Sequence, residues 1–263
     1  MATTASPSSP GPLILAVNQV PPLQALRWLK LGWADFVRAP MPGLLHGIAV
    51  ALGGWIVLAL GERHWSLLAG AFSGFVLMGP ILATGLYELS RRLARGESAG
   101  LPDAIAAWRR GTRPLVWMGI LLALAGTLWV VVSALLFLLL VKTPIAGPLD
   151  FLRYVVQVQS TFLFVLWTAL GGVGAAIVFA ATAVSPPLLL ARDVDLRSAI
   201  MTSVRAVGEN PVAMGVWATI IMIATAFSLA TFMLGFVIAI PLIGHATWHA
   251  YQDLIDATKV PAR

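Results

Sequence analysis

Hydrophobic positions along the chain fall into six long uncharged runs separated by shorter polar segments. The runs cover about residues 42–61, 66–87, 114–141, 160–190, 211–231 and 232–252. A helix that rises 1.5 Å per residue needs about 20 apolar residues to cross roughly 30 Å of hydrocarbon, and each run has that length. The last two runs are nearly continuous, so a tight reversal is expected near Leu229–Leu234. The pattern therefore predicts an all-α polytopic membrane helix bundle with six transmembrane helices.

The polar segments before the first, third and fifth runs have a helical period. In residues 22–38, apolar positions such as Leu26 and Trp33 share one face, whereas Arg27 lies on another. Residues 102–112 and 195–208 follow the same pattern, with Asp193 or Asp195 as N-cap of the latter. Helices with apolar and basic faces lie in the membrane interface. We therefore predict three units, each an interfacial amphipathic helix followed by a transmembrane hairpin.

One segment occurs twice. The sequence GFVLMGP at Gly74–Pro80 returns 161 positions later as GFVIAIP at Gly235–Pro241. Because each predicted hairpin starts and ends on the same side, the repeats would be parallel, related by an axis along the membrane normal. Pro80 and Pro241 would each remove a helical hydrogen bond and kink their helices. Such kinks serve packing in most membrane helices, and matched interruptions mark substrate sites in some transporters.

Composition supports a membrane location. The chain is 59% hydrophobic and 11% charged, against about 25% charged residues in soluble domains. Residues 1–21 are rich in Ser, Thr and Pro and lack Lys and Arg, which predicts a disordered tail and not a signal peptide. We expect the membrane domain to span residues 22–253, followed by a short cytoplasmic tail at 254–263. The absence of cysteine excludes disulfides and thiolate metal sites.

The basic residues predict an orientation. If both termini face the cytoplasm, every Lys and Arg lies on that side except Arg63, Lys142 and Arg153. The positive-inside rule thus favours an N-in, C-in topology. This excess would attract anionic lipid headgroups, or a partner in a larger membrane complex. The arginines expected to form this surface lie too close to membrane helices for a nucleic-acid patch; they are Arg91, Arg92, Arg109, Arg110 and Arg205.

Three histidines and one carboxylate are expected at a similar depth. His245 and His249 are spaced i, i+4 and share a helix face, and His46 lies about one turn inside the first run. In the repeat, Glu88 is the counterpart of His249. Imidazoles and a carboxylate at one level could hold a transition metal or haem. The alternative is that these groups hydrogen-bond neighbouring helices or lipid headgroups. No other cofactor is predicted.

Two motifs carry a family resemblance. The sequences GPILATGLYE at Gly79–Glu88, followed by Ser90-Arg91-Arg92, and PLIGHATWHAY at Pro241–Tyr251 resemble a bacterial family of integral membrane proteins, a domain of unknown function. The resemblance covers about residues 25–256 and implies a six-span protein of the bacterial cytoplasmic (inner) membrane. Some members of the family are labelled putative cytochrome c oxidase. A haem–copper oxidase catalytic subunit resembles a bundle with six histidine ligands, and this chain has four histidines in all, so it is not that subunit.

Sequence motifs give little support to an enzyme. The chain has no phosphate-binding Gly-rich loop ending in Lys-Ser/Thr, no HExxH and no GxSxG. The leading prediction is a non-enzymatic accessory, assembly or lipid-associated membrane component. One alternative is a transporter or channel for an uncharged or amphipathic solute, which a cavity between the second and sixth runs would favour. The other is a haem- or metal-binding respiratory accessory protein.

Small residues predict close helix contacts. Gly43 and Gly47, like Gly70 and Gly74, are four positions apart, and Gly171-Gly172-x-Gly174 lies in the fourth run. Such spacing lets two membrane helices approach closely. We expect most of these contacts to lie within the bundle, with homo-oligomerisation as the alternative.

Overall fold

A computed structural model describes residues 13–61, 65–141 and 161–263 of the chain. The described residues are predominantly helical, which confirms the predicted all-α membrane bundle. The helices are α1 (Gln24–Arg38), α2 (Pro40–Gly61), α3 (Trp65–Leu77), α4 (Gly79–Leu82), α5 (Thr84–Ala94), α6 (Leu101–Arg110), α7 (Arg113–Leu140), α9 (Thr161–Thr182), α10 (Ser185–Ala191), α11 (Leu196–Glu209), α12 (Pro211–Ala230) and α13 (Phe236–Leu254). Two short strands, β1 (Ala16–Val17) and β2 (Ile255–Asp256), form an antiparallel sheet.

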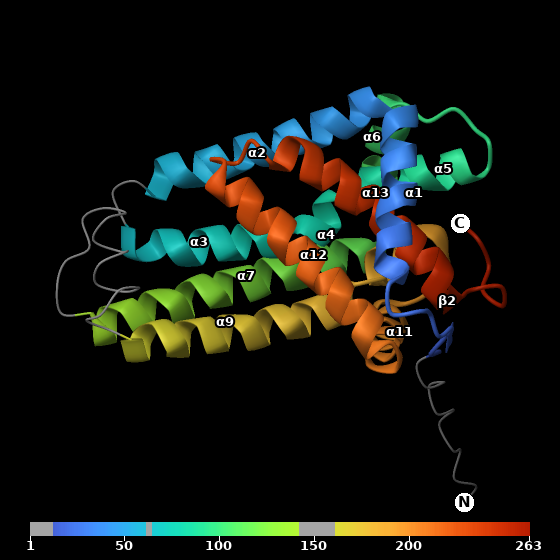
Figure 1. Ribbon diagram of the computed structural model, residues 1–263. Helices are drawn as coiled ribbons and strands as arrows, with labels where there is room; N and C mark the ends of the chain where they lie inside the picture. The colour runs from blue at the N-terminus through green and yellow to red at the C-terminus, as the bar shows by residue number, and fades with distance from the viewer. Residues whose placement is uncertain (1–12, 62–64, 142–160) are drawn as a thin grey trace, which may run out of the picture.

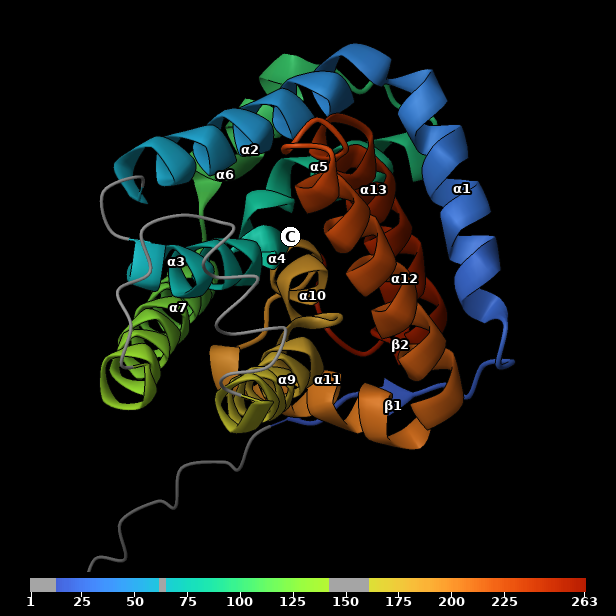
Figure 2. The ribbon, with the colours of Figure 1, turned by 60° about the vertical axis from the view of Figure 1, so that its left-hand side comes forward.

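The long helices lie across the molecule and the shorter elements gather at one end (Figure 1). We call this the capped end; it carries α1, α5, α6, α11 and the two-stranded sheet. Figure 2 shows α2, α3 and α7 on one side of the bundle and α12 and α13 on the other, with α4 and α10 between them. Helices α1, α6 and α11 form where the amphipathic segments were predicted. Asp195 caps α11 by accepting a hydrogen bond from the Ser198 backbone N–H (2.9 Å).

Four of the six hydrophobic runs form helices long and apolar enough to span a membrane. These candidate spans are Pro40–Leu60, Arg113–Leu140, Phe162–Ala191 and Pro211–Ala230. The second run is divided, because α3 ends at Leu77 and α4 and α5 follow as separate helices. The sixth run forms α13, whose second half carries several polar side chains. The chain returns along the bundle through α3–α5 and through α13 (Figure 1), but the predicted count of six spans is not confirmed.

The two copies of the repeated segment adopt different local structures. Pro80 lies in the first turn of α4, where a missing N–H costs no helical hydrogen bond. Pro241 instead lies inside the continuous helix α13. The break at Pro80 and the unbroken path through Pro241 leave the predicted repeat of hairpins unconfirmed. Similar sequences therefore do not impose the same backbone here.

The reversal between α12 and α13 occurs over residues 231–235, as predicted. Phe232 and Met233 have left-handed backbone conformations, with φ of 51° and 70°. Such values are uncommon for bulky residues and need support from their surroundings. The Trp55 indole N–H on α2 donates to the Phe232 carbonyl (2.8 Å), and Met233 is buried. Contacts with α2 thus hold the turn.

Close helix contacts are found at most of the predicted glycines. A Cβ added to Gly47 would lie 2.6 Å from the Val237 Cα in α13. A Cβ added to Gly74 would lie 3.0 Å from the Gly126 carbonyl oxygen in α7. Around Gly172 and Gly174, by contrast, an added Cβ would meet no atom within 4 Å. The glycines of α2 and α3 therefore serve internal packing, whereas these two on α9 do not.

Residues 13–21 are ordered, so the predicted disorder of residues 1–21 is wrong for this part; residues 1–12 lie outside the described residues. Strand β1 pairs with β2, joining Ala16 to Asp256 and Val17 to Ile255. Side chains of α11 and the residue that follows it accept backbone N–H groups from this segment, for example Ser198 from Leu13 (2.9 Å). These bonds replace the hydrogen bonds to water that a disordered chain would make.

Candidate functional site

Four polar side chains from three helices form one hydrogen-bonded network at the capped end. The Ser90 hydroxyl of α5 donates to Asp35 Oδ2 of α1 (2.8 Å) and lies 2.8 Å from His245 Nδ1 of α13. His249 Nε2 lies 2.8 Å from the same Asp35 oxygen. Asp35, Ser90 and His245 are buried. The network therefore connects α1, α5 and α13 in the interior.

The proton on Ser90 determines the form of His245. A serine hydroxyl has one proton, and here it points to Asp35, so His245 Nδ1 must carry the N–H that Ser90 accepts. The Nε2 atom is buried and has no hydrogen-bond partner among the described residues. A second N–H at Nε2 would be buried without an acceptor, so this arrangement favours the neutral imidazole at His245.

Asp35 is ionised at neutral pH. Burial acts to raise the pKa of this carboxyl group, but hydrogen bonds from His249 and Ser90 favour the charged form and leave the pKa below its ordinary value. The carboxylate can therefore accept both bonds. Its position inside the bundle makes it the charged centre of the network.

Glu88 belongs to a separate cluster. Its side chain is 1% exposed and lies 2.8 Å from Arg91 Nε and 3.0 Å from Arg110 Nη2. Arg91 also donates to the backbone carbonyl of Arg263 (2.9 Å). The cluster joins α5 and α6 to the C-terminal residue, and two arginines balance the buried negative charge.

The four predicted metal ligands are divided among different partners. His46 Nδ1 bonds the Pro42 carbonyl within α2 (2.7 Å), Glu88 pairs with arginines, and His245 and His249 bind Ser90 and Asp35. Among the residues that the structure describes, no three His, Asp or Glu side chains are placed to hold a metal ion. Glu88, His245 and His249 therefore bond side chains of neighbouring helices, whereas His46 bonds the backbone of its own helix.

Most of the predicted basic surface is neutralised within the chain. Arg92 lies 3.3 Å from Asp103, and Arg205 lies 2.5 Å from Glu209. Of the five predicted arginines, Arg109 is the member that makes no ion pair within the described ranges, and it is exposed. The exposed cations Arg27, Lys30 and Arg38 of α1 likewise make no ion pair with described residues.

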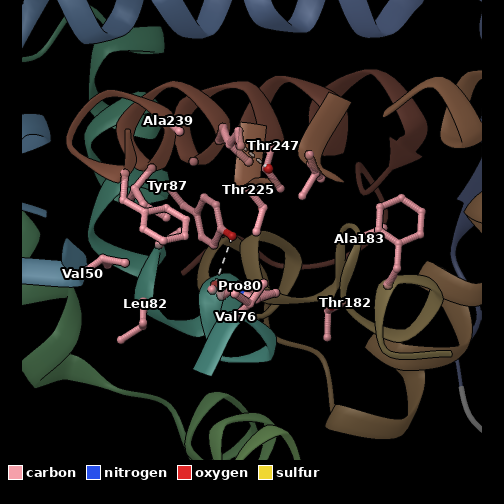
Figure 3. A pocket seen from close by; sticks show the side chains of 18 of the residues that line it. Val50, Val76, Pro80, Leu82, Tyr87, Thr182, Ala183, Thr225, Ala239 and Thr247 are labelled. Atoms are coloured by element: carbon pink, nitrogen blue, oxygen red, sulfur yellow. Dashed lines mark hydrogen bonds between the residues drawn. The ribbon is translucent and has the colours of Figure 1, made fainter. Parts of the chain in front are cut away.

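A cavity of ≈ 120 Å³ lies between α3–α5, α9, α12 and α13 (Figure 3). Its lining is apolar and includes Phe75, Phe179 and Trp217. The Tyr87 hydroxyl in the wall donates to the Pro80 carbonyl (3.0 Å), as the dashed line in Figure 3 shows. This cavity lies between the second and sixth runs, where a cavity would favour the solute-binding alternative.

Asp35 and Ser90 are the functional candidates that sequence reasoning missed. Asp35 lies on the face of α1 that also carries Ala25, Trp28 and Gly32, and this face is buried against α13. Ala25 and Gly32 contribute little apolar surface, so the hydrophobic pattern of this face is weak. The pattern therefore did not predict that Asp35 is buried. The spacing i, i+3, i+7, i+10 from Ala25 to Asp35 was the available signal.

Residues 67–191 match the family described as predicted integral membrane protein (DUF2189). No curated protein and no solved structure matches the chain. The matched range runs from α3 to α10 and contains Glu88 and Ser90, but not α1 or α13. The match agrees with the predicted resemblance to a family of unknown function. Together with the four long apolar helices, it identifies an integral membrane protein.

Proposed function

We propose that this integral membrane protein is a non-enzymatic, lipid-associated component of the bacterial cytoplasmic membrane. In this proposal the capped end faces the cytoplasm, and α1 lies on the inner leaflet and binds anionic lipid headgroups. The observation that supports it is the outward face of α1. This face carries exposed apolar side chains beside cations that make no ion pair with any carboxylate of the described residues.

The exposed residues of α1 form two adjacent strips. Leu26, Trp33 and Val37 are each at least 50% exposed. At 100° per residue, these side chains cover one side of the outward face, and Arg27 and Arg38 cover the other. Helix α1 lies across the direction of α2, α3 and α7 (Figure 1), which is the orientation of a helix in the membrane plane.

The expected energy is modest but measurable. A Lys or Arg close to an anionic membrane surface contributes about 1 kcal/mol, and salt screens the attraction. The three cations Arg27, Lys30 and Arg38 would together contribute about 3 kcal/mol at low ionic strength. Phosphatidylglycerol should therefore be retained over phosphatidylcholine during gentle purification.

The test replaces the three cations by glutamine in one variant. Mass-spectrometric analysis of lipids that remain after purification from mixed vesicles should show less phosphatidylglycerol than in the wild type. Arg205→Gln is the control, because that arginine is exposed but already paired with Glu209. An unchanged lipid ratio in the triple variant would contradict the proposal.

A protein partner remains a separate part of the proposal. Arg109 is the predicted surface residue whose charge is exposed and unpaired within the described chain, so a larger membrane complex that docks on this surface should depend on it. Arg109→Glu should reduce co-purification of that complex. Equal recovery from wild type and variant would remove Arg109 from the partner surface.

The cavity favours a second candidate, a transporter for an uncharged or amphipathic solute. Its walls include residues on both sides of the Pro80 break and residues beside Pro241. Reconstituted vesicles with fluorescent phospholipid provide the test, since a lipid transporter should accelerate exchange between leaflets. Exchange at the rate of protein-free vesicles would exclude phospholipid transport.

A further inference from the structure

The cavity lies at the depth of lipid chains. Trp217 and Thr225 line it from α12, which begins at Pro211 near the capped end. At 1.5 Å per residue along the helix, these two residues lie about 9 and 21 Å from Pro211. Both depths fall within a hydrocarbon layer of about 30 Å. A molecule in the cavity would therefore be level with acyl chains and not with headgroups.

The chemistry of the walls selects hydrocarbon. The Thr182 hydroxyl donates to the Val178 carbonyl in its own helix (2.7 Å). The Thr247 hydroxyl likewise donates to the Ile243 carbonyl (2.7 Å), and the Tyr87 hydroxyl donates to the Pro80 carbonyl. Three of the four hydroxyl groups in the lining thus have partners without any ligand, and Thr225 carries the fourth. An apolar cavity of about 150 Å³ engineered in another protein stays dry and binds benzene. A cavity of this size and lining should likewise admit an apolar group and exclude water.

The helices beside the cavity face lipid. On α9, Val173 and Ile177 are more than 60% exposed, and Ile223 on α12 is as well. Helices α9 and α12 make little contact with each other, although both contribute to the cavity wall. Acyl chains of the surrounding bilayer are therefore the apolar groups closest to these two helices.

Unfilled space continues to the break in the second run. Gly79 lines the cavity, and a Cβ added there would meet no atom within 4 Å. The division of this run into α3 and α4 therefore leaves a gap that no side chain of the described residues fills. Interiors of folded proteins are normally packed without such voids, so a bound group would complete the packing.

From these observations we infer that the cavity binds part of one acyl chain of a membrane phospholipid. The headgroup would remain at the membrane surface, and a chain segment would enter between α9 and α12. This site is separate from the surface of α1, because it recognises the chain and makes no use of the headgroup charge. Loss of headgroup binding by α1 would leave it unaffected.

The test uses phosphatidylglycerol with a diazirine group midway along one acyl chain, reconstituted with the full-length protein. Illumination and peptide mass spectrometry should find label on Trp217, which is only 1% exposed, as well as on the exposed Ile223. Ala239 lies in the cavity wall (Figure 3), so Ala239→Leu should abolish label on Trp217 and preserve label on Ile223.

Ala176→Leu is the matched control, since it adds the same volume to an exposed position on α9 that does not line the cavity. Label on Trp217 should persist in this variant. If Ala239→Leu does not fold, Thr225→Leu fills the cavity from α12 instead. Three results would overturn the inference: no label on Trp217 in the wild type, equal label in the cavity-filling variant, or label only from a free diazirine fatty acid.

Discussion

At the residue scale, Asp35 makes the stability of the protein depend on pH. Its pKa in the folded state is lower than the ordinary 3.8, because the bonds from His249 and Ser90 outweigh the effect of burial. The carboxylate therefore stabilises the fold above the unfolded-state pKa, and this contribution is lost as the pH falls through the lower folded-state pKa.

We predict that the unfolding temperature in detergent falls when the pH is lowered below about 4. Asp35→Asn should lower the unfolding temperature already at pH 7, through a loss of about 1–3 kcal/mol in unfolding free energy. It should also weaken the dependence of the unfolding temperature on acid. Glu209→Gln, which breaks an exposed ion pair, should change stability by less than about 1 kcal/mol. An acid response of the same size in Asp35→Asn would contradict this role.

Tyr87 makes a second prediction at this scale. Its hydroxyl is the partner of the Pro80 carbonyl beside an apolar cavity. Tyr87→Phe would leave that carbonyl unpaired and should destabilise the protein by about 1 kcal/mol, measured by thermal unfolding. An unchanged unfolding temperature would mean that another group replaces the hydroxyl.

The sequence located His245 and His249 because their i, i+4 spacing is local. It could not locate their partners, since Asp35 is 214 positions from His249 and Ser90 is 155 positions from His245. Which polar groups meet depends on how α1, α5 and α13 pack. A single sequence contains no direct record of those contacts.

At the element scale, hydrophobic runs predict where helices lie better than where they break. The run over residues 66–87 is apolar on both sides of Met78, so its composition does not distinguish one helix from two. Pro80 was the visible signal, and it predicted a kink. In the structure Pro80 lies in the first turn of α4, where proline is tolerated, and a separate helix begins there instead of a kink.

Close contact between α2 and α13 gives a prediction at this scale. A Cβ at Gly47 would overlap the backbone of Val237 and Phe236, which cannot move aside as a side chain can. Gly47→Ala should therefore separate the helices and cost about 1–3 kcal/mol in unfolding free energy. Gly172→Ala is the control, because its added methyl group meets open space. Equal stability of the two variants would contradict the observed contact.

At the scale of the whole molecule, the capped end accounts for the charge distribution. Every Lys and Arg described in the structure belongs to an element or connection near that end, whereas Arg63, Lys142 and Arg153 lie outside the described residues. Composition therefore predicted the class of the protein and the grouping of its cations. The number of spans was harder to predict, because it depends on whether α3–α5 and α13 cross as broken or polar helices.

Cysteine labelling tests the orientation, since the chain contains no cysteine of its own. A membrane-impermeant maleimide should modify Ser98→Cys and Lys259→Cys only in inside-out vesicles, because the positive-inside rule predicts that the capped end faces the cytoplasm. Leu60→Cys, near the opposite end of α2, should react only from the outer face. Reaction of Ser98→Cys in intact cells would reverse the orientation.

The pairing of β1 with β2 also has a consequence for the order of folding during synthesis. Residues 16–18 leave the ribosome long before residues 253–256, with which they form hydrogen bonds. At roughly 5–20 residues per second, the first segment must wait for tens of seconds before its partner is made. During this interval β1 lacks its partner strand, and its backbone groups can bond water instead. The capped end is therefore completed last, and newly made chains that have inserted all their apolar helices still lack it.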